Sequence, residues 1–147
     1  MRHLAVDFGT RRVGLAISDA GGKFAEPLDV WPATRDLAER VAELCRREGV
    51  QRLVVGLPLN MDGTSSWVTR EAVSLGRSLT AATGLPVVYV DERLSSFEAE
   101  DQLRRRKQGG ERLTRNDRKR RLDALSAAHF LREFLDGRLA AIDPDTL

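Results

Sequence analysis

The sequence has little cysteine, little histidine and no long apolar run. Its one cysteine, Cys45, excludes an intramolecular disulfide and a cysteine-based zinc site. Its two histidines, His3 and His129, stand in no metal-ligand spacing. No apolar run approaches the roughly 20 residues that span a bilayer, and the N-terminal segment passes directly into a predicted strand rather than a signal or transit peptide. These absences predict a cytoplasmic protein that does not enter a membrane.

The composition is that of an ordinary folded protein. Hydrophobic residues make up 41% of the 147 and charged residues 31%, which argues against disorder. The length suits one domain with a substantial hydrophobic core. No repeat, low-complexity tract or linker interrupts the chain, so residues 1–147 are expected to form a single domain.

The net charge of +2 conceals a strong local asymmetry. Of 24 basic and 22 acidic residues, ten basic and two acidic residues lie between positions 104 and 121, so this segment carries +8 and the remainder −6. The ten are Arg104, Arg105, Arg106, Lys107, Arg112, Arg115, Arg118, Lys119, Arg120 and Arg121. Charge runs often form solvated helix faces. Segregation of this size favours a surface that binds a polyanion such as nucleic acid.

The stretch LAVDFGTRRVGLAISD, residues 4–19, predicts two strands joined by a tight turn. Leu4–Val6 lead into Asp7, and Val13–Ile17 form the return strand. A carboxylate at the end of an apolar strand is costly to bury unless a metal or a donor meets it. Asp7 could instead be an exposed turn residue. The alternative hypothesis is that the Asp7 carboxylate binds a metal ion, whose other ligands must come from elsewhere in the chain.

The remaining chain alternates between helical and strand patterns. An edge strand is predicted over 23–31, where it contains Pro27, and further strands are predicted over 51–56 and 85–90. Helices are predicted over 35–48, capped by Thr34, and over 67–82, capped by Ser65 or Ser66. A third helix is predicted after Ser95 or Ser96, followed by a loop over 108–116 and a last helix over 117–135. Three hairpin-connected strands followed by two strand–helix units predict a mixed α/β sheet flanked by helices.

Acidic residues recur where these strands end. Asp91 and Glu92 follow the last strand as Asp7 follows the first, and functional groups gather at the carboxyl ends of strands in such sheets. Asp123 shares a helical stripe with the apolar Ala127, which points it toward the sheet. Converging carboxylates repel one another without a cation, and oxygen ligands suit Mg²⁺ or Mn²⁺. Two such ions can support phosphodiester hydrolysis.

Four motifs, DFGTRRVGLAISD, VVGLPLNMDGT, DERLSSFEAE and RLDALSAAHFL, resemble in order and spacing the YqgF/RuvX family. These ribonuclease H-like proteins are described as Holliday-junction resolvases and pre-16S rRNA processing nucleases. The resemblance spans almost the whole chain and implies a five-stranded mixed sheet with the first strand central. It also implies that Asp7, Glu92 and Asp123 are the catalytic and metal-binding acids. Asp91 could replace Glu92, because adjacent strand residues face opposite ways.

Basic and polar side chains near these acids are candidate contacts for a phosphate backbone. Arg11 and Arg12 could meet a phosphate or be ordinary turn charges, and Arg93 could meet a phosphate or pair with a neighbouring acid. Three polar residues of the 57–64 loop could contact substrate or only shape their turn. They are Asn60, Asp62 and Thr64. The expected nucleic-acid-binding residues are Arg11, Arg12, Arg93, Arg104, Arg105, Arg106, Lys107, Arg112, Arg115, Arg118, Lys119 and Arg121.

The pattern predicts a metal-dependent endonuclease acting on precursor 16S rRNA or on branched DNA such as a Holliday junction. One rival is a non-catalytic ribosome-assembly factor that binds nucleic acid on a nuclease-like fold. Another is a phosphotransferase, since DFGT also resembles the phosphate-binding hairpin of the actin, Hsp70 and sugar-kinase superfamily. That architecture needs two such domains, and 147 residues supply one. A junction resolvase is expected to form a homodimer, because two symmetric cuts need two sites.

Overall fold

The computed structural model describes residues 1–94 and 115–147. The predicted helix after Ser96 and almost all of the predicted 108–116 loop lie outside these residues. The described elements are β1 (His3–Phe8), β2 (Arg12–Ser18), β3 (Ala25–Pro32), α1 (Leu37–Glu48), β4 (Arg52–Leu57), α2 (Trp67–Thr83), β5 (Val87–Asp91), a short 3₁₀ turn (Glu92–Leu94), α4 (Arg115–Leu135), β6 (Ala141–Ile142) and a second 3₁₀ turn (Pro144–Thr146).

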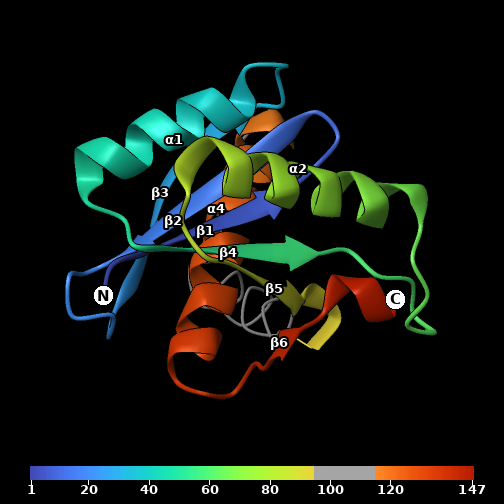
Figure 1. Cartoon of the computed structure of the whole chain (residues 1–147). Coiled ribbons are helices and arrows are strands. Elements are labelled where there is room, and N and C mark those ends of the chain that lie inside the picture. Colours follow the sequence, from blue (N-terminus) through green and yellow to red (C-terminus); the bar gives the residue numbers. More distant parts are fainter. Residues whose placement is uncertain (95–114) are drawn as a thin grey trace, which may run out of the picture.

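The strands form one mixed sheet in the order β3-β2-β1-β4-β5-β6 (Figure 1). β1 pairs antiparallel with β2 and parallel with β4, β3 pairs antiparallel with β2, and β5 pairs parallel with β4. The predicted arrangement of three antiparallel strands followed by two parallel ones is confirmed, with β1 at the centre of the five. The sheet also contains a sixth strand, β6, which pairs antiparallel with β5 and was not predicted.

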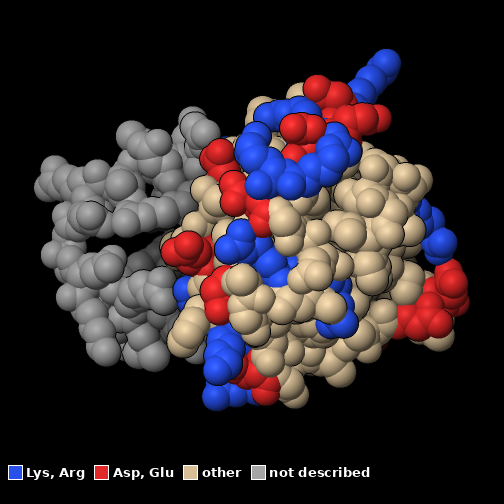
Figure 2. Space-filling view, turned by 60° about the vertical axis from the view of Figure 1, so that its left-hand side comes forward, with Lys and Arg blue, Asp and Glu red and all other residues tan. Residues whose placement is uncertain are grey.

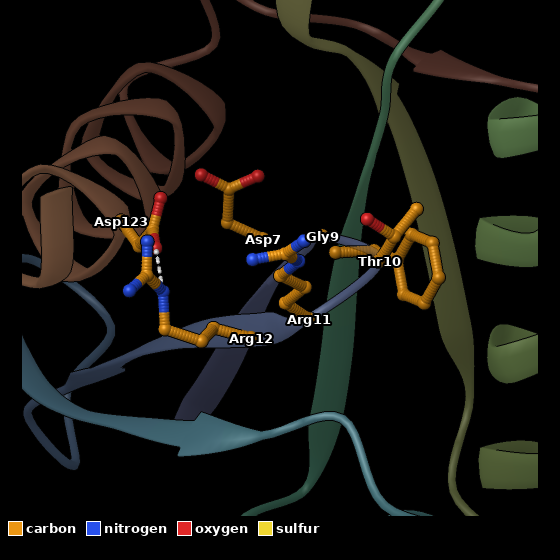
Figure 3. A pocket seen from close by; sticks show the side chains of 7 residues that line it. Asp7, Gly9, Thr10, Arg11, Arg12 and Asp123 are labelled. Carbon is orange, nitrogen blue, oxygen red and sulfur yellow. Dashed lines mark ion pairs between the residues drawn. The ribbon is translucent and has the colours of Figure 1, made fainter.

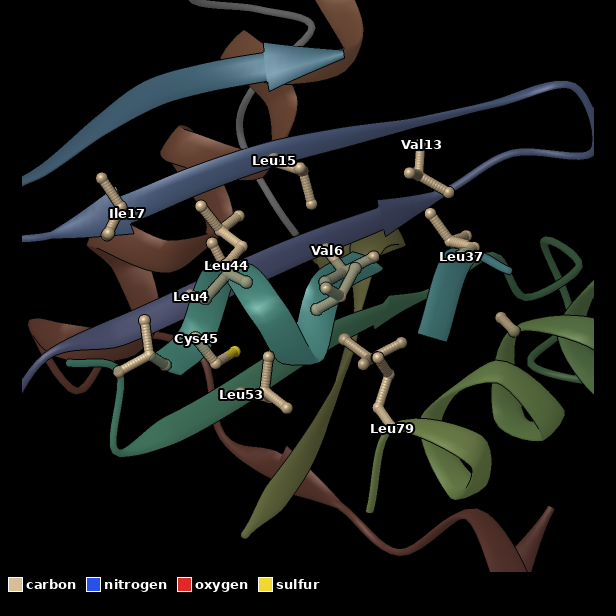
Figure 4. Packing of buried hydrophobic residues seen from close by; sticks show 14 of the residues in the cluster. Leu4, Val6, Val13, Leu15, Ile17, Leu37, Leu44, Cys45, Leu53 and Leu79 are labelled. Atoms are coloured by element: carbon tan, nitrogen blue, oxygen red, sulfur yellow. The ribbon is translucent and has the colours of Figure 1, made fainter. Parts of the chain in front are cut away.

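Helices cover both faces of the sheet. α1 and α2 pack on one face and α4 lies across the other (Figure 1). Alternate residues of β1 therefore enter different cores: Leu4 and Val6 pack with α1 and α2, whereas Ala5 packs with α4. Figure 4 shows the first of these cores between the strands and α1. Asp7 lies two residues after Ala5, so its side chain points to the same face of the sheet, the one that α4 covers.

The helix ends follow their local sequence closely. α1 buries Leu37, Val41, Leu44 and Cys45 as predicted, and Gly49 ends it in the left-handed conformation at φ +68°. The prediction that Thr34 caps this helix is wrong. α1 begins at Leu37 with Asp36 in the cap position, and the Thr34 hydroxyl donates to the Asp36 carboxylate instead of serving as an acceptor for a helix N–H.

The N-terminus of α2 is closed by a capping box. The Ser66 hydroxyl accepts from the Thr69 backbone N–H at 3.3 Å, and the Thr69 hydroxyl accepts from the Ser66 N–H at 3.0 Å. Of the two serines predicted as the cap, Ser66 is the one that serves. This cap fixes where the loop after β4 returns to the body of the protein.

Both sheet edges are short or interrupted. β3 lies at one edge and carries Pro27, as predicted, and its pairing with β2 is irregular between Leu15 and Ala16. β6, two residues long, lies at the other edge. Within residues 1–94 and 115–147, no helix combines the length and apolar character needed to cross a membrane.

Candidate active site

Asp7, on the central strand β1, lies between two glycines of the neighbouring strands. It pairs with Gly14 of β2 on one side and with Gly56 of β4 on the other. Neither neighbour carries a side chain, so other segments can approach the Asp7 carboxylate closely on the α4 face of the sheet. Parallel β1, β4 and β5 also bring their carboxyl ends to the same edge, where Asp7 and Glu92 lie.

The two glycines admit different neighbours. A Cβ on Gly14 would collide with the α4 backbone, lying 2.8 Å from the Ala124 nitrogen and closer still to the Asp123 carbonyl. A Cβ on Gly56 would lie 2.8 Å from Cγ of Glu92 and 2.9 Å from Cε2 of Phe130. Gly14 therefore lets α4 approach the sheet at Asp123, and Gly56 leaves the space that the Glu92 side chain fills.

Asp7 and Glu92 form a hydrogen-bonded pair. Burial and the neighbouring Asp7 carboxylate raise the pKa of Glu92 well above its ordinary value. Burial also raises the pKa of Asp7, against the opposing effect of hydrogen bonds from Glu92 and from the Ser126 hydroxyl. Burial and the repulsion between the two carboxylates therefore both oppose loss of the protons from this pair.

Asp123 approaches the pair from α4 and is held by an arginine. Its Oδ2 lies 3.5 Å from Nε of Arg12, and the two side chains are 36% and 31% exposed. Its negative charge also raises the pKa values of Asp7 and Glu92. Asp7 and Asp123 thus approach one another from β1 and α4, with Arg12 reaching over from β2 (Figure 3).

An open pocket of about 210 Å³ lies at this point. It is lined by Asp7, Phe8, Gly9, Thr10, Arg11, Arg12 and Asp123. Arg11 and Arg12 therefore do lie beside Asp7, as the sequence suggested, and Arg12 pairs with Asp123. The pocket combines carboxylates that suit a cation with guanidinium groups that suit a phosphate.

Asp91 is turned away from this pocket. Asp91 lies two residues after Tyr89, so the two side chains point to the same face of the sheet. The Tyr89 ring packs against Gly76 of α2 on that face, which is opposite to the face that α4 covers. The Asp91 side chain is 6% exposed and forms an ion pair with Arg93, with a distance of 2.6 Å between Oδ2 and Nη2. Of the two adjacent acids, Glu92 is therefore the one that meets Asp7. Arg93 pairs with a neighbouring acid, one of its two predicted alternatives.

The side chains of the 57–64 loop form hydrogen bonds within the loop. The Asn60 side chain donates to the Thr64 hydroxyl at 2.9 Å, and the Thr64 hydroxyl donates to the Asp62 carboxylate at 2.6 Å. These contacts correspond to the turn-shaping alternative. Gly63 completes the turn at φ +86°, a conformation that favours glycine.

Comparison with known proteins identifies the family of the chain. Residues 1–137 match the family model described as "RuvX: Holliday junction resolvase". The chain belongs to the RuvX family. A relative from Anaeromyxobacter sp. (strain Fw109-5), named "Putative pre-16S rRNA nuclease", is 46% identical over 143 residues, covering 95% of this chain and all of the relative. A relative of the same name from Thermosynechococcus vestitus is 37% identical and covers 96% of each chain.

Solved structures show the same fold at lower identity. RuvC from Thermus thermophilus, solved in complex with a Holliday junction substrate, aligns with a TM-score of 0.58 and 17% identity, covering 97% of this chain and 100% of that one. A second structure of Thermus thermophilus RuvC gives a TM-score of 0.59 at 16% identity. The RuvX chain therefore has the RuvC-like ribonuclease H fold.

The carboxylates of this RuvX chain fit a hard divalent cation by their chemistry. Oε1 of Glu92 is buried without a hydrogen-bond partner, the state of an oxygen that still needs a partner. Within the described parts of the chain, however, no three His, Cys, Asp or Glu side chains are already grouped to hold a metal ion. Asp7, Glu92 and Asp123 would be the residues to hold such an ion.

The basic segment is described only in part. Arg104, Arg105, Arg106, Lys107 and Arg112 lie outside the described residues. Arg115, Arg118, Lys119 and Arg121 belong to the first part of α4. On the face shown in Figure 2, the basic and acidic side chains of the described residues are intermixed.

Three residues of the site escaped the sequence reasoning. Ser126 stands three residues after Asp123, a spacing that places both on one helix face, and this signal could have found it. Gly14 and Gly56 gave no such signal, because their importance depends on which strand pairs with Asp7.

Proposed function

We propose that this protein is a metal-dependent endonuclease that hydrolyses phosphodiester bonds in structured nucleic acid, either precursor 16S rRNA or a four-way DNA junction. One observation carries the proposal: Asp7 and Glu92, far apart in sequence, are in contact at the carboxyl end of the central strand, and Asp123 lies near enough for its charge to raise both their pKa values. Two half-buried carboxyls in contact destabilise a fold, so their presence favours a functional role.

In this proposal Asp7, Glu92 and Asp123 hold the metal. Bound Mg²⁺ or Mn²⁺, in a two-ion site, would supply a Lewis acid and an activated water. The Ser126 hydroxyl orients Asp7 through its hydrogen bond. Arg11 and Arg12, at the rim of the pocket, bind the phosphate backbone. Asp91 has no ligand role, because its carboxylate is committed to Arg93.

The basic residues between 104 and 121 supply the wider binding surface. The net charge of +8 on residues 104–121 provides attraction for a polyanion that depends little on sequence. Precursor rRNA and branched DNA both satisfy this requirement. A junction substrate would further require a homodimer, with one site for each of the two cuts.

Cleavage assays test the proposal directly. Wild type and Asp7→Asn are incubated with a labelled four-way DNA junction and with a structured precursor rRNA, each with Mg²⁺, Mn²⁺ or EDTA. We expect cleavage of one substrate that requires the metal and is lost in Asp7→Asn, with binding retained. Asp136→Asn is the matched control, because it removes an exposed carboxylate just beyond the other end of α4.

The rival is a non-catalytic assembly factor, and the pairing of Asp123 with Arg12 is the observation that favours it. In that case wild type and Asp7→Asn bind nucleic acid equally and neither cleaves it under any metal condition. Full cleavage by Asp7→Asn would instead refute the assignment of the metal site while leaving a nuclease in place.

A further inference from the structure

Asp91 and Arg93 flank Glu92 in sequence and bind each other around it. The Arg93 backbone N–H donates to Oδ1 of Asp91 at 2.9 Å. Its Nε lies 3.1 and 3.2 Å from the two carboxylate oxygens, and its Nη2 donates to Oδ2 at 2.6 Å. The bonds close the 3₁₀ turn that begins at Glu92. With its two neighbours fixed on each other, Glu92 is directed toward the opposite face of the sheet, where Asp7 lies.

The same guanidinium reaches the loop that follows β4. Nη1 of Arg93 donates to the Met61 carbonyl at 2.9 Å, and a Cβ on Gly63 would lie 3.5 Å from Nη2. The loop already holds its own shape through the Asn60 N–H, which donates to the Thr64 carbonyl at 2.9 Å. Arg93 therefore fixes where this preformed turn lies relative to Glu92. The turn presents the Met61 side chain, 93% exposed, to the surroundings.

We propose that Asp91 and Arg93 are positioning residues: their pair holds Glu92 toward Asp7 and fixes the 57–64 loop beside it. This inference rests on the proposed function, in which Glu92 binds metal. It replaces the expectation that Arg93 binds phosphate. The Nε–Nη2 side of the guanidinium binds a carboxylate that is 6% exposed, and Nη1 binds the Met61 carbonyl, so a phosphate could pair bidentately with Nε and Nη2 only by displacing Asp91.

Matched variants separate the two roles. Asp91→Asn and Arg93→Gln each break the pair, the double variant removes both charges, and Arg93→Lys keeps the positive charge without the planar fork. Mn²⁺ affinity is measured by calorimetry on the full chain. Hydrogen exchange reports the 57–64 loop, and nucleic-acid binding is measured against salt concentration. The double variant is essential, since Arg93→Gln alone leaves a buried unpaired carboxylate that can unfold the protein.

If the pair positions Glu92, Asp91→Asn, Arg93→Gln and Arg93→Lys each weaken Mn²⁺ binding by about 10- to 100-fold, the range for residues that orient metal ligands. The double variant is then no worse than either single variant. Hydrogen exchange rises in the 57–64 loop and stays unchanged in β1 and β4. Nucleic-acid binding keeps its dependence on salt.

A phosphate-binding Arg93 gives the opposite pattern and overturns the inference. Arg93→Gln alone then weakens nucleic-acid binding and lowers the salt slope by about one, while Arg93→Lys and Asp91→Asn behave as wild type. Arg77→Gln serves as the control, because it removes a 2.7 Å ion pair to Asp145 away from the pocket. We expect it to leave all three measurements unchanged.

Failure of the proposed function can be told apart from failure of this inference. If wild type neither binds Mn²⁺ nor cleaves, the proposed function fails, and the pair is judged on hydrogen exchange alone. Loss of loop protection in Arg93→Lys then supports the positioning of the loop. Unchanged protection in that variant overturns it.

Discussion

Gly56 and Asp7 are paired across β4 and β1, and the missing side chain at Gly56 provides the space that Glu92 occupies. The contact between the two acids thus depends on a residue that has no chemistry of its own. Gly14 plays the corresponding part on the other side of Asp7, where it admits the α4 backbone at Asp123. The two glycines beside Asp7 therefore let Glu92 contact it and let the α4 backbone at Asp123 approach the sheet.

Gly56→Ala should therefore damage the site more than the fold. The new methyl group displaces the flexible Glu92 side chain and presses on the Phe130 ring. We expect cleavage to fall about 100-fold, as for other misplaced catalytic groups, with a loss of about 1–3 kcal/mol in stability from overpacking. Gly84→Ala is the control, since it strains a left-handed residue in open space and should leave cleavage intact. Equal cleavage by the two variants would contradict this account.

Glu92→Gln should stabilise the protein at neutral pH while abolishing cleavage. The folded protein raises the pKa of Glu92 through burial and the nearby Asp7. The unfolded chain, in which a glutamate has a pKa of about 4.3, therefore loses this proton first, and wild-type stability falls as the pH rises from there toward the folded pKa. The variant lacks this loss. We expect it to gain on the order of 1 kcal/mol at pH 8 and nothing at pH 4, measured by urea unfolding.

Arg12→Gln should change metal binding and substrate binding in opposite directions. Removing the guanidinium releases one hold on the Asp123 carboxylate, so Mn²⁺ affinity should rise. Nucleic-acid binding should weaken, because the pocket loses a cation that faces the phosphate. Stability should change by less than about 1 kcal/mol, since both partners are about one-third exposed. Calorimetry with Mn²⁺ and a filter-binding assay measure the two affinities, and a parallel fall in both would exclude the opposed roles.

Cys45 should report unfolding rather than react in the folded state. Its burial raises the pKa of the thiol to about 11, so the folded protein keeps it protonated at pH 8. An exposed cysteine, with a pKa of about 8.5, is partly ionised there and reacts readily. Labelling by a thiol reagent should be slow in buffer, fast in urea, and slower still when Mn²⁺ stabilises the fold. Rapid labelling in buffer would mean that α1 opens locally.

Reversing Arg118 and Arg121 to glutamate should weaken nucleic-acid binding across sequences and flatten its salt dependence. Both positions belong to the basic segment, which carries +8 while the rest of the chain carries −6. Counterion release predicts a lower slope for each lost phosphate contact. Reversal of Arg46 and Arg47 at the end of α1 makes the control. An unchanged slope in the first variant would remove this segment from the interface.

β-branched runs and glycine stops were local signals, and they predicted five strands of the mixed sheet, while the central place of β1 followed from the resemblance to the family. The helical stripe around Ala127 predicted a face of the last helix that packs on the sheet, and Ala127 is buried there. The choice between Asp91 and Glu92 remained open because alternation alone cannot show which face carries which helix. It became clear only once Tyr89 was seen against α2 and Val90 against α4.

What escaped prediction depends on contacts between distant segments. β6 is two residues long, too short to give a periodic pattern, and exists through its pairing with β5. Thr34 had the right chemistry for a helix cap but bonded to Asp36. The pairing of Arg12 with Asp123 joins residues 111 positions apart and could not be read from either neighbourhood.

The two sheet edges limit how a second copy could attach. Pro27 in β3 has no backbone N–H to donate, and β6 has only two residues with which another strand could pair. Two subunits acting on opposite arms of a junction would then meet through helices or loops rather than through a continuous ladder. The spacing between their two cuts would be set by side-chain packing at that contact, and so could be altered by substitutions that leave each pocket untouched.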